Sequence, residues 1–241
     1  MFHYIFFIIC IIEVINATTI KNENDIINAL SKNTSSKVII NIDSEIDVTE
    51  EIKINNSIKT LYITGNSLDS SKLNLKYSLY FDSSIKELKI KNINIDGNLF
   101  FKNNEKIIID NVNLKGYIDS DFDENCNNSI EITELSYKSK EESVENCINL
   151  SGNIDIKNSN FFGNSSCRNR LLHYKGFRKY KFYLKESYFN GDYECPFLSI
   201  EKASYASIKS ILFEKGYSSI DIWGGYIKKY YYRLKILLFN M

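Results

Sequence analysis

The fold is decided by the stretches LKIKNINIDG (residues 88–97) and IIIDNVNLKG (residues 107–116). Both place an apolar residue at the third position, a polar residue at the fourth, Asn at the fifth and an apolar residue at the eighth. The frame returns, with Asn, Glu or Ser at the fifth position, in stretches that begin at Ile130, Ile154, Phe182 and Ala206. Successive starts lie 19, 23, 24, 28 and 24 residues apart, and such a near-constant period is typical of a solenoid.

Alternating apolar residues within each stretch predict a short strand that buries one row of side chains. The fifth position predicts a turn, because Asn tolerates left-handed backbone geometry, and stacked Asn side chains should form a ladder there at Asn92, Asn111 and Asn158. A close backbone approach or a positive φ is expected at the glycines that close the stretches, which are Gly97, Gly116, Gly163 and Gly191.

A strand this short cannot bury its apolar row alone, but turns stacked about 4.8 Å apart pair every strand with its neighbours. Weaker copies of the pattern near residues 37–42, 52–54 and 61–64 bring the count to about eight coils. The predicted fold is therefore an all-β, right-handed parallel β-helix over residues 36–227. A leucine-rich-repeat horseshoe is the main alternative. It is disfavoured because the Asn falls one position too early and the later repeats lack the leading Leu.

The two ends of the chain differ from the repeat. Residues 1–17, MFHYIFFIICIIEVINA, have the pattern of a signal peptide cleaved after Ala17. A membrane anchor is disfavoured because Glu13 breaks the apolar run short of the roughly 20 residues that a span needs. Residues 18–35 are predicted to form a cap with a short amphipathic helix, which begins at Asn22 or Asn24 and covers the open edge of the first coil.

The C-terminal residues 228–241 are expected to be irregular. They alternate basic, aromatic and apolar side chains and fit neither a coil nor a membrane span. Three interpretations stay open: a cap, a tail that binds a membrane surface or a partner, and the end of a truncated reading frame, which is slightly favoured.

Charge excludes some classes of partner. The chain has 30 Lys and Arg and 30 Asp and Glu, and removal of the signal takes away only Glu13 from this balance. The mature chain then has no net field that would attract nucleic acid or acidic lipid. No later stretch is long and apolar enough to span a bilayer. The expected location is extracellular, either secreted or at the cell surface.

The cysteines predict two disulfides, because Cys10 leaves with the signal and four remain for an oxidising compartment. Cys167 and Cys195 stand at the same distance along the chain from their repeat starts, so they should stack on adjacent coils and pair. Cys126 and Cys147 then pair by exclusion. N-glycosylation acceptors for a eukaryotic source occur at Asn33, Asn55, Asn127, Asn149 and Asn164.

Three short motifs resemble those of a known family. FFGN (residues 161–164), FNGD (189–192) and GGYI (224–227) are similar to the F-x-x-N and G-G-A-[ILV] elements of polymorphic outer-membrane-protein repeats. Tyr226 replaces the Ala of the second element. These repeats belong to the pectin-lyase-like right-handed β-helix superfamily. The resemblance implies a surface or secreted protein that serves adhesion or structure, while other branches are polysaccharide lyases and hydrolases.

No catalytic constellation of those enzymes is assembled in the sequence, so we predict no catalytic residue and no bound cofactor. His3 lies in the signal, His173 is interpreted as a packed or surface histidine, and the Arg-x-Lys match at residues 233–235 lies in the tail. Asp119, Asp121 and Asp123 are weak candidates for calcium ligands. A solvated loop is favoured there, because the Gly and Glu that an EF-hand loop needs are missing.

A dense series of Tyr, Arg and Lys suggests a ligand surface at Arg178, Tyr180 and Tyr183, because aromatic residues with Arg are enriched at binding surfaces. Core filling is the favoured alternative for these aromatics. The function we expect is a secreted, non-catalytic repeat protein that displays its surface for adhesion, cell-surface association or assembly. The alternatives are a carbohydrate-active lyase or hydrolase and a glycan-binding module. The expected partner is cell-wall glycan or another extracellular protein.

Overall fold

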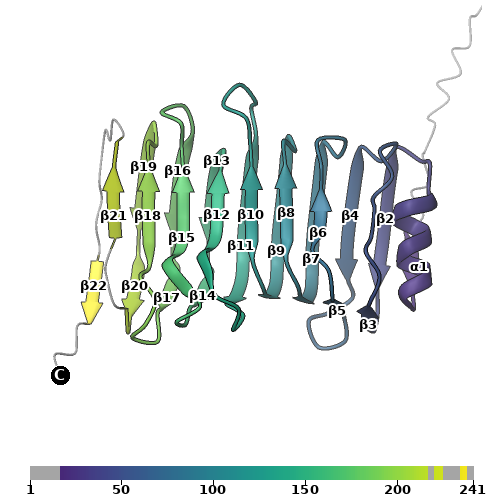
Figure 1. Cartoon of the computed structure of the whole chain (residues 1–241), viewed down its shortest axis with the longest axis horizontal. Helices are drawn as coiled ribbons and strands as arrows, with labels where there is room; N and C mark the ends of the chain where they lie inside the picture. Colours follow the sequence, from purple (N-terminus) through teal and green to yellow (C-terminus); the bar gives the residue numbers. More distant parts are fainter. Residues whose placement is uncertain (1–16, 217–219, 225–233, 238–241) are drawn as a thin grey trace, which may run out of the picture.

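A computed structural model describes residues 17–216, 220–224 and 234–237. These residues form a parallel β-solenoid of about eight turns with one short helical segment at the N-terminal end (Figure 1). The all-β solenoid prediction is confirmed. A leucine-rich-repeat horseshoe is excluded, because most turns contribute strands at three positions, which we call the first, second and third faces.

Two of the faces belong to one sheet that bends, because three long strands cross from the first face to the second. These are β7 (Glu87–Asp96), β9 (Lys106–Lys115) and β11 (Ser129–Lys138). The first face also contains β1 (Thr18–Ile20), β2 (Lys37–Ile42), β4 (Thr60–Gly65), β13 (Asn153–Lys157), β16 (Lys181–Lys185) and β19 (Tyr205–Lys209). The second face also contains β3 (Glu45–Val48), β5 (Lys72–Leu75), β14 (Asn160–Phe162), β17 (Tyr188–Asn190), β20 (Ile211–Glu214) and β22 (Leu234–Leu237).

The third face is a separate sheet of seven strands. It consists of β6 (Leu79–Phe81), β8 (Leu99–Lys102), β10 (Ile118–Asp121), β12 (Val144–Ser151), β15 (Cys167–Lys175), β18 (Leu198–Glu201) and β21 (Ile220–Trp223).

The predicted frame of the repeat is confirmed by the pairing of the strands. Each repeat start lies directly opposite the next one, in the order Leu88, Ile107, Ile130, Ile154, Phe182 and Ala206. All six side chains are buried, as are the apolar side chains at the third and eighth positions. The inward rows therefore stack into one continuous core, which no single turn could form alone.

The bend between the first two faces is built by the fifth position of the repeat. All six residues there have a φ between 49° and 56°, and they are Asn92, Asn111, Glu134, Asn158, Glu186 and Ser210. The predicted left-handed turn is thus confirmed even where Asn is replaced. The side-chain ladder is confirmed for one step, since Asn111 Nδ2 donates to Asn92 Oδ1 at 3.0 Å. Glu134 stands between Asn111 and Asn158 and breaks it.

The predicted close approach is confirmed at Gly97, Gly116, Gly163 and Gly191, and two of them show what a side chain would meet. A Cβ atom added to Gly97 would lie 2.6 Å from Leu75 Cβ, and one added to Gly163 would lie 2.8 Å from Cys195 Sγ. Both distances are below those of real contacts, so any larger residue would push apart two stacked turns.

Two strand predictions are wrong. Residues 52–54 form no strand, although Ile52 is buried. They follow β3 in the first turn, and no strand pairs with them there. The tail is not wholly irregular, since β22 pairs with β20 in the register of the solenoid. The predicted signal up to residue 16, together with residues 225–233 and 238–241, lies outside the described part of the chain.

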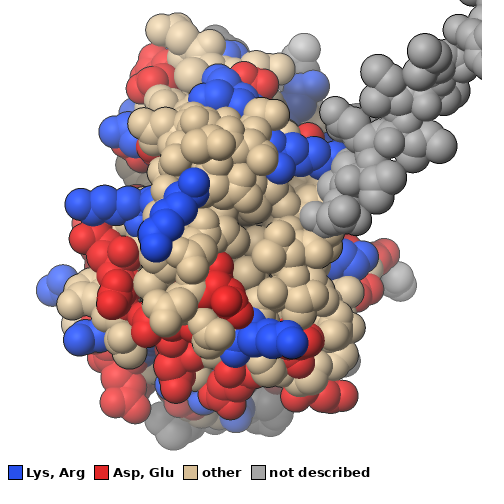
Figure 2. All heavy atoms as spheres, turned by 90° about the vertical axis from the view of Figure 1, so that its right-hand side faces the viewer, with Lys and Arg blue, Asp and Glu red and all other residues tan. Residues whose placement is uncertain are grey.

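The predicted cap is present at the N-terminal end. Helix α1 (Glu23–Ile27) begins after Asn22, whose side chain accepts the Asp25 N–H, and it continues into η1, a π-helical turn over Asn28–Lys32. The π-helical turn was not predicted. Ile26 and Leu30 are buried against the first turn. Acidic and basic side chains lie beside one another on this end of the molecule (Figure 2).

Glu23 ties the cap to the first turn. Its carboxylate accepts the N–H groups of Thr49 and Glu50, the latter at 2.8 Å, together with the Thr49 hydroxyl. These backbone hydrogen bonds hold the pKa of Glu23 below its ordinary value. A carboxyl whose pKa is lowered by folding stabilises the fold above its unfolded pKa, and this contribution is lost as the pH falls through the folded pKa.

We therefore expect Glu23→Gln to lower the melting temperature at pH 7, and we expect this effect to shrink as the pH falls through the lowered folded pKa of Glu23. Thermal melts of both proteins at several pH values measure this difference. Glu51→Gln is the matched control, because the exposed Glu51 makes no described contact. A loss that stays the same as the pH is lowered until the wild type itself is destabilised by acid would contradict the role of the charge.

Candidate functional site

The solenoid is hollowed where its second face meets its third face. In two early turns only two residues join the faces, 97–98 and 116–117. In the next three turns the connection lengthens to residues 139–143, 163–166 and 191–197. Residues from all three longer loops line a pocket of about 390 Å³, which we call the corner groove.

The floor of the corner groove is formed by the ninth position of the repeat. Cross-strand pairing places Lys115 beside Lys138, Lys138 beside Phe162, and Phe162 beside Asn190. These side chains point outward because they alternate with the buried eighth-position residues. The loops add Ser139, Glu141, Gly163, Asn164 and Asp192.

A second pocket of about 360 Å³ adjoins the corner groove and shares Lys115 and Lys138 with it. It continues over the outer surface of β5, β7, β9 and β11. Its amides are held in place, since Asn113 Nδ2 donates to Asn94 Oδ1 at 2.7 Å and Asn94 Nδ2 donates to the Ser71 carbonyl at 3.3 Å. The two pockets together follow the second face across several turns.

The charges in the corner groove are unevenly paired. Asp96 receives two ammonium groups, Lys140 Nζ at 3.0 Å and Lys115 Nζ at 3.8 Å. The Lys138 ammonium, by contrast, has no hydrogen bond or ion pair with any residue that the structure describes. Lys138 lines both pockets, so its charge is available to a bound molecule.

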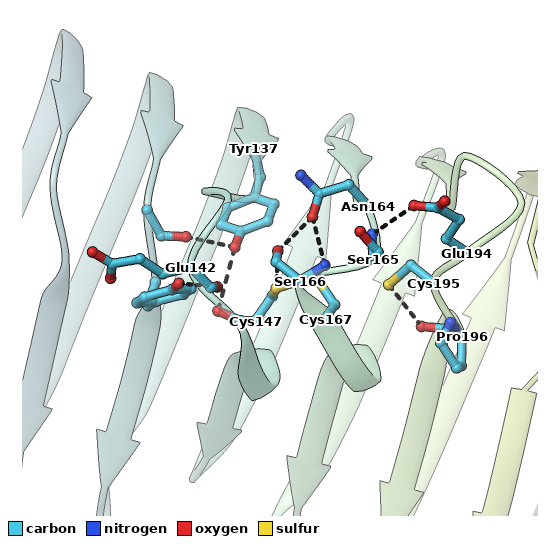
Figure 3. The surroundings of a disulfide bond; sticks show 12 residues. Tyr137, Glu142, Cys147, Asn164, Ser165, Ser166, Cys167, Glu194, Cys195 and Pro196 are labelled. Carbon is cyan, nitrogen blue, oxygen red and sulfur yellow. Dashed lines mark hydrogen bonds between the residues drawn. A yellow bond between two sulfur atoms is a disulfide. The ribbon is translucent and has the colours of Figure 1, made fainter.

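Hydrogen bonds fix the loops that wall the corner groove. Tyr117 Oη donates to the Glu142 carbonyl, which holds the first loop. The Ser165 N–H donates to the Glu194 carboxylate at 3.1 Å, which joins the second loop to the third (Figure 3). The Ser139 N–H donates to the Phe162 carbonyl at 3.0 Å. The walls are therefore held by contacts between neighbouring turns.

A disulfide joins Cys147 to Cys167 at this same corner, with their Cα atoms 5.2 Å apart (Figure 3). The predicted pairs Cys167–Cys195 and Cys126–Cys147 are therefore wrong. The bond links β12 to the start of β15 and so connects two successive turns behind the loops of the corner groove.

The physical reason is that the number of residues between stacked partners differs between the second face and the third. Phe161 pairs with Phe189 on the second face, whereas Leu172 pairs with Leu198 on the third, where the two partners are closer in sequence. Counting from the first-face start therefore fails on the third face. Cys126 is excluded as a partner of Cys147 because it lies beyond β10, in the turn that returns to the first face.

Cys195 and Cys126 are free. Cys195 is fully buried, and this burial raises the pKa of its thiol to about 12. The thiol donates to the Pro196 carbonyl at 3.3 Å. Cys195 therefore acts as a packed core residue rather than a reactive group.

The structure does not bring the calcium candidates together. Asp121 faces Lys102, with the charged atoms 3.7 Å apart, and Asp123 accepts a hydrogen bond from Asn103 Nδ2 at 2.6 Å. Asp119 is half-buried, and burial is the main cause that raises its pKa. Within the described residues, no three His, Cys, Asp or Glu side chains are close enough to hold a metal ion.

The predicted ligand surface at Arg178, Tyr180 and Tyr183 is not one surface. Tyr180 is fully buried, and its hydroxyl donates to the Asp123 carbonyl at 2.9 Å. Tyr183 lies on the outer first face against Tyr205, with ring centroids 5.5 Å apart. Arg178 is exposed in the turn before β16. The core-filling alternative holds for Tyr180, which the density of aromatics in the sequence could not distinguish.

The five glycosylation candidates occupy different settings. Asn127 is exposed in a turn, while Asn149 lies within β12 and is half-buried. The other three form local turns in which the Asn Oδ1 accepts the N–H two residues on, at 2.9 Å in each case, and they are Asn33, Asn55 and Asn164.

Sequence reasoning missed Lys115, Lys138 and Phe162 as site residues. Their signal was present at the ninth position of the aligned repeats, which reads Asp96, Lys115, Lys138, Phe162, Asn190 and Glu214. The pattern alone could not show which part of this row is walled by loops, because loop length does not enter the repeat.

The resemblance motifs lie at the same corner. Phe161 and Phe189 are stacked in the core with ring centroids 4.6 Å apart, and Asn164 and Asp192 line the corner groove. Of the third motif, only Gly224 is described. None of the described helices is long and apolar enough to span a bilayer. Comparison with protein-family models, with curated proteins and with solved structures gave no match for this chain.

Proposed function

We propose that this chain is a secreted, non-catalytic β-solenoid that binds an extended glycan in the corner groove and thereby associates with a cell surface. One observation carries the proposal: two adjoining pockets share Lys115 and Lys138 and follow the second face across several turns. A long polymer suits such a site better than a compact ligand does.

The chemistry of the lining supports a sugar ligand. Asn94, Asn113, Asn164 and Asn190 offer amide donors and acceptors for hydroxyl groups, and Phe162 offers a partly exposed ring. An aromatic ring beside fixed polar groups is the combination that orients an amphipathic ligand.

Two features support secretion. Strand β1 begins at Thr18, directly after the expected cleavage site at Ala17, and pairs with β2. The Cys147–Cys167 disulfide is the kind of bond that persists in oxidising compartments. We also propose right-handed winding, as in the pectin-lyase-like superfamily, because crossovers between parallel strands are right-handed in nearly all proteins.

A second candidate function rests on the carboxylates of the same pocket. Glu141 and Asp192 both line the corner groove, and a pair of carboxylates that flanks a sugar is the basis of most glycoside hydrolysis. A carbohydrate-active enzyme is therefore the alternative proposal for this site.

The test is binding of the purified protein to an array of plant, fungal and bacterial polysaccharides. We expect Lys138→Ala to weaken binding of the retained glycan at least about tenfold, since hydrogen bonds to charged groups contribute about 1.5–3 kcal/mol. Lys53→Ala is the matched control, because the exposed Lys53 lies in the first turn, away from the groove. Equal binding by wild type and Lys138→Ala would contradict the site.

Incubation of the same glycans with the protein separates the two functions. Unchanged chain length after prolonged incubation is expected for a binding protein. Release of new reducing ends that stops in Glu141→Gln or Asp192→Asn would favour the enzyme instead.

A further inference from the structure

The outer surface of the third face carries a second, unrelated row of side chains. Cross-strand pairing places Tyr80 beside Phe100, Phe100 beside Asp119, Asp119 beside Asn149 and Asn149 beside His173. These residues alternate along their strands with buried ones, so all of them point to solvent. The row thus begins with two aromatic rings and continues with polar groups.

The two rings form a flat aromatic stack. Their centroids are 4.8 Å apart and their planes differ by 16°. Tyr80 is 56% exposed, which is unusual for a large aromatic side chain, and Phe100 is partly exposed. Strand β6 is the last strand of its sheet in the part of the chain that the structure describes. The Tyr80 ring therefore has no partner from a neighbouring strand on that side.

The neighbours of the stack are hydrogen-bonding groups rather than apolar ones. Asp119 follows Phe100 in the row, and it is half-buried, with burial raising the pKa of its carboxyl while the Asn149 amide opposes that shift. Further along, His173 Nδ1 lies 2.6 Å from Ser199 Oγ. A ligand that covers the rings would therefore meet a carboxylate and an amide at its edge.

We propose that Tyr80, Phe100, Asp119 and Asn149 form a second ligand site, the aromatic platform, which binds a neutral sugar ring. A pyranose ring has one apolar C–H face and a rim of hydroxyl groups. The C–H face covers the exposed ring surface of the stack, and the hydroxyls donate to Asp119 and accept from Asn149. An apolar protein segment suits this site less well, because it would bury the Asp119 carboxylate further without adding a hydrogen-bond donor to it.

The aromatic platform and the corner groove lie on different faces, so the molecule has two ligand sites. Because the platform contains none of the groove residues, its binding does not depend on the proposed function of the groove. A protein with both sites joins two glycan chains, and its avidity for a polymer surface exceeds that of either site.

The test uses soluble neutral oligosaccharides, namely β-1,4-linked oligomers of glucose, xylose and N-acetylglucosamine, in titrations followed by NMR. We expect saturable binding of at least one of them. Tyr80→Ala and Phe100→Ala should each weaken it about tenfold, while Trp223→Ala should not. Trp223 is the matched control, because it is 54% exposed on β21, at the opposite end of the same sheet.

Lys138→Ala separates this proposal from the proposed function. Platform binding that persists in Lys138→Ala supports an independent site. Binding that is lost in Lys138→Ala and unchanged in Tyr80→Ala would overturn the aromatic platform while the corner groove stands. Absence of binding by all three oligomers, with a melting temperature that shows a folded protein, would also overturn it.

Discussion

Replacing Phe189 with alanine should lower the free energy of unfolding by about 3–5 kcal/mol, the range found when a buried Phe is truncated. Phe189 is fully buried in the second-face row. Its ring centroid lies 4.6 Å from that of Phe161 and 5.0 Å from that of Phe213, the aromatic residues of the turns before and after it. Truncation therefore leaves a cavity between two turns. The turns cannot move together to fill it without breaking the hydrogen bonds that pair their strands.

Denaturant unfolding followed by circular dichroism measures this loss. Phe162→Ala is the matched control, because Phe162 stands next to Phe161 but points outward and is only partly buried. We expect a loss of about 1 kcal/mol there, as is common for single substitutions outside a core. Similar losses in the two variants would show that the second-face row is not a packed core.

Removing the disulfide should have the second largest effect. The double variant Cys147→Ala, Cys167→Ala should be less stable than the wild type by about 2–4 kcal/mol, because the bond restricts the unfolded chain. The bond closes a segment with a sequence separation of 20 residues. Reduction of the wild-type protein should produce a loss of the same size, which unfolding with and without reductant measures.

Cys126→Ala is the control for this experiment. Cys126 is free and only partly buried, so its replacement should change stability by no more than about 0.5 kcal/mol. Peptide mapping without reductant should recover Cys147 joined to Cys167. A peptide that joins Cys167 to Cys195 would contradict this explanation, which depends on the different residue spacing of stacked partners on the second and third faces.

The first and second faces could be predicted from the sequence because their signals are local. Apolar alternation identifies the strands, and the left-handed residue at the fifth position fixes where each strand bends. Glu134, Glu186 and Ser210 adopt the same turn as the Asn residues, so the geometry belongs to the stacked fold rather than to Asn itself. The six repeat starts share one register because apolar residues alternate along each strand and the bend always falls at the fifth position of the repeat.

The third face could not be predicted in the same way, because loops of different lengths separate it from the repeat frame. The disulfide pairing failed at this point, and the site residues of the corner groove were missed for the same reason. Tyr180 was misplaced because composition does not show whether a tyrosine ring fills the core or faces solvent. Its buried hydroxyl finds backbone carbonyl partners at Asp123 and Cys126, in an earlier turn of the solenoid that the repeat pattern does not connect to it.

From β7 onward, loop length varies greatly at one corner of the solenoid and very little at the bend between the first and second faces, although residues 66–71 form a longer loop at that bend in an earlier turn. The corner between the second and third faces accepts connections from two residues (97–98) to seven (191–197) while the strands on either side stay paired. At this corner the loops can therefore change in length while the paired strands that hold them stay the same. Foreign peptides grafted between Lys138 and Val144 should be displayed without rebuilding the core, which would make this chain a starting point for a library of engineered binders.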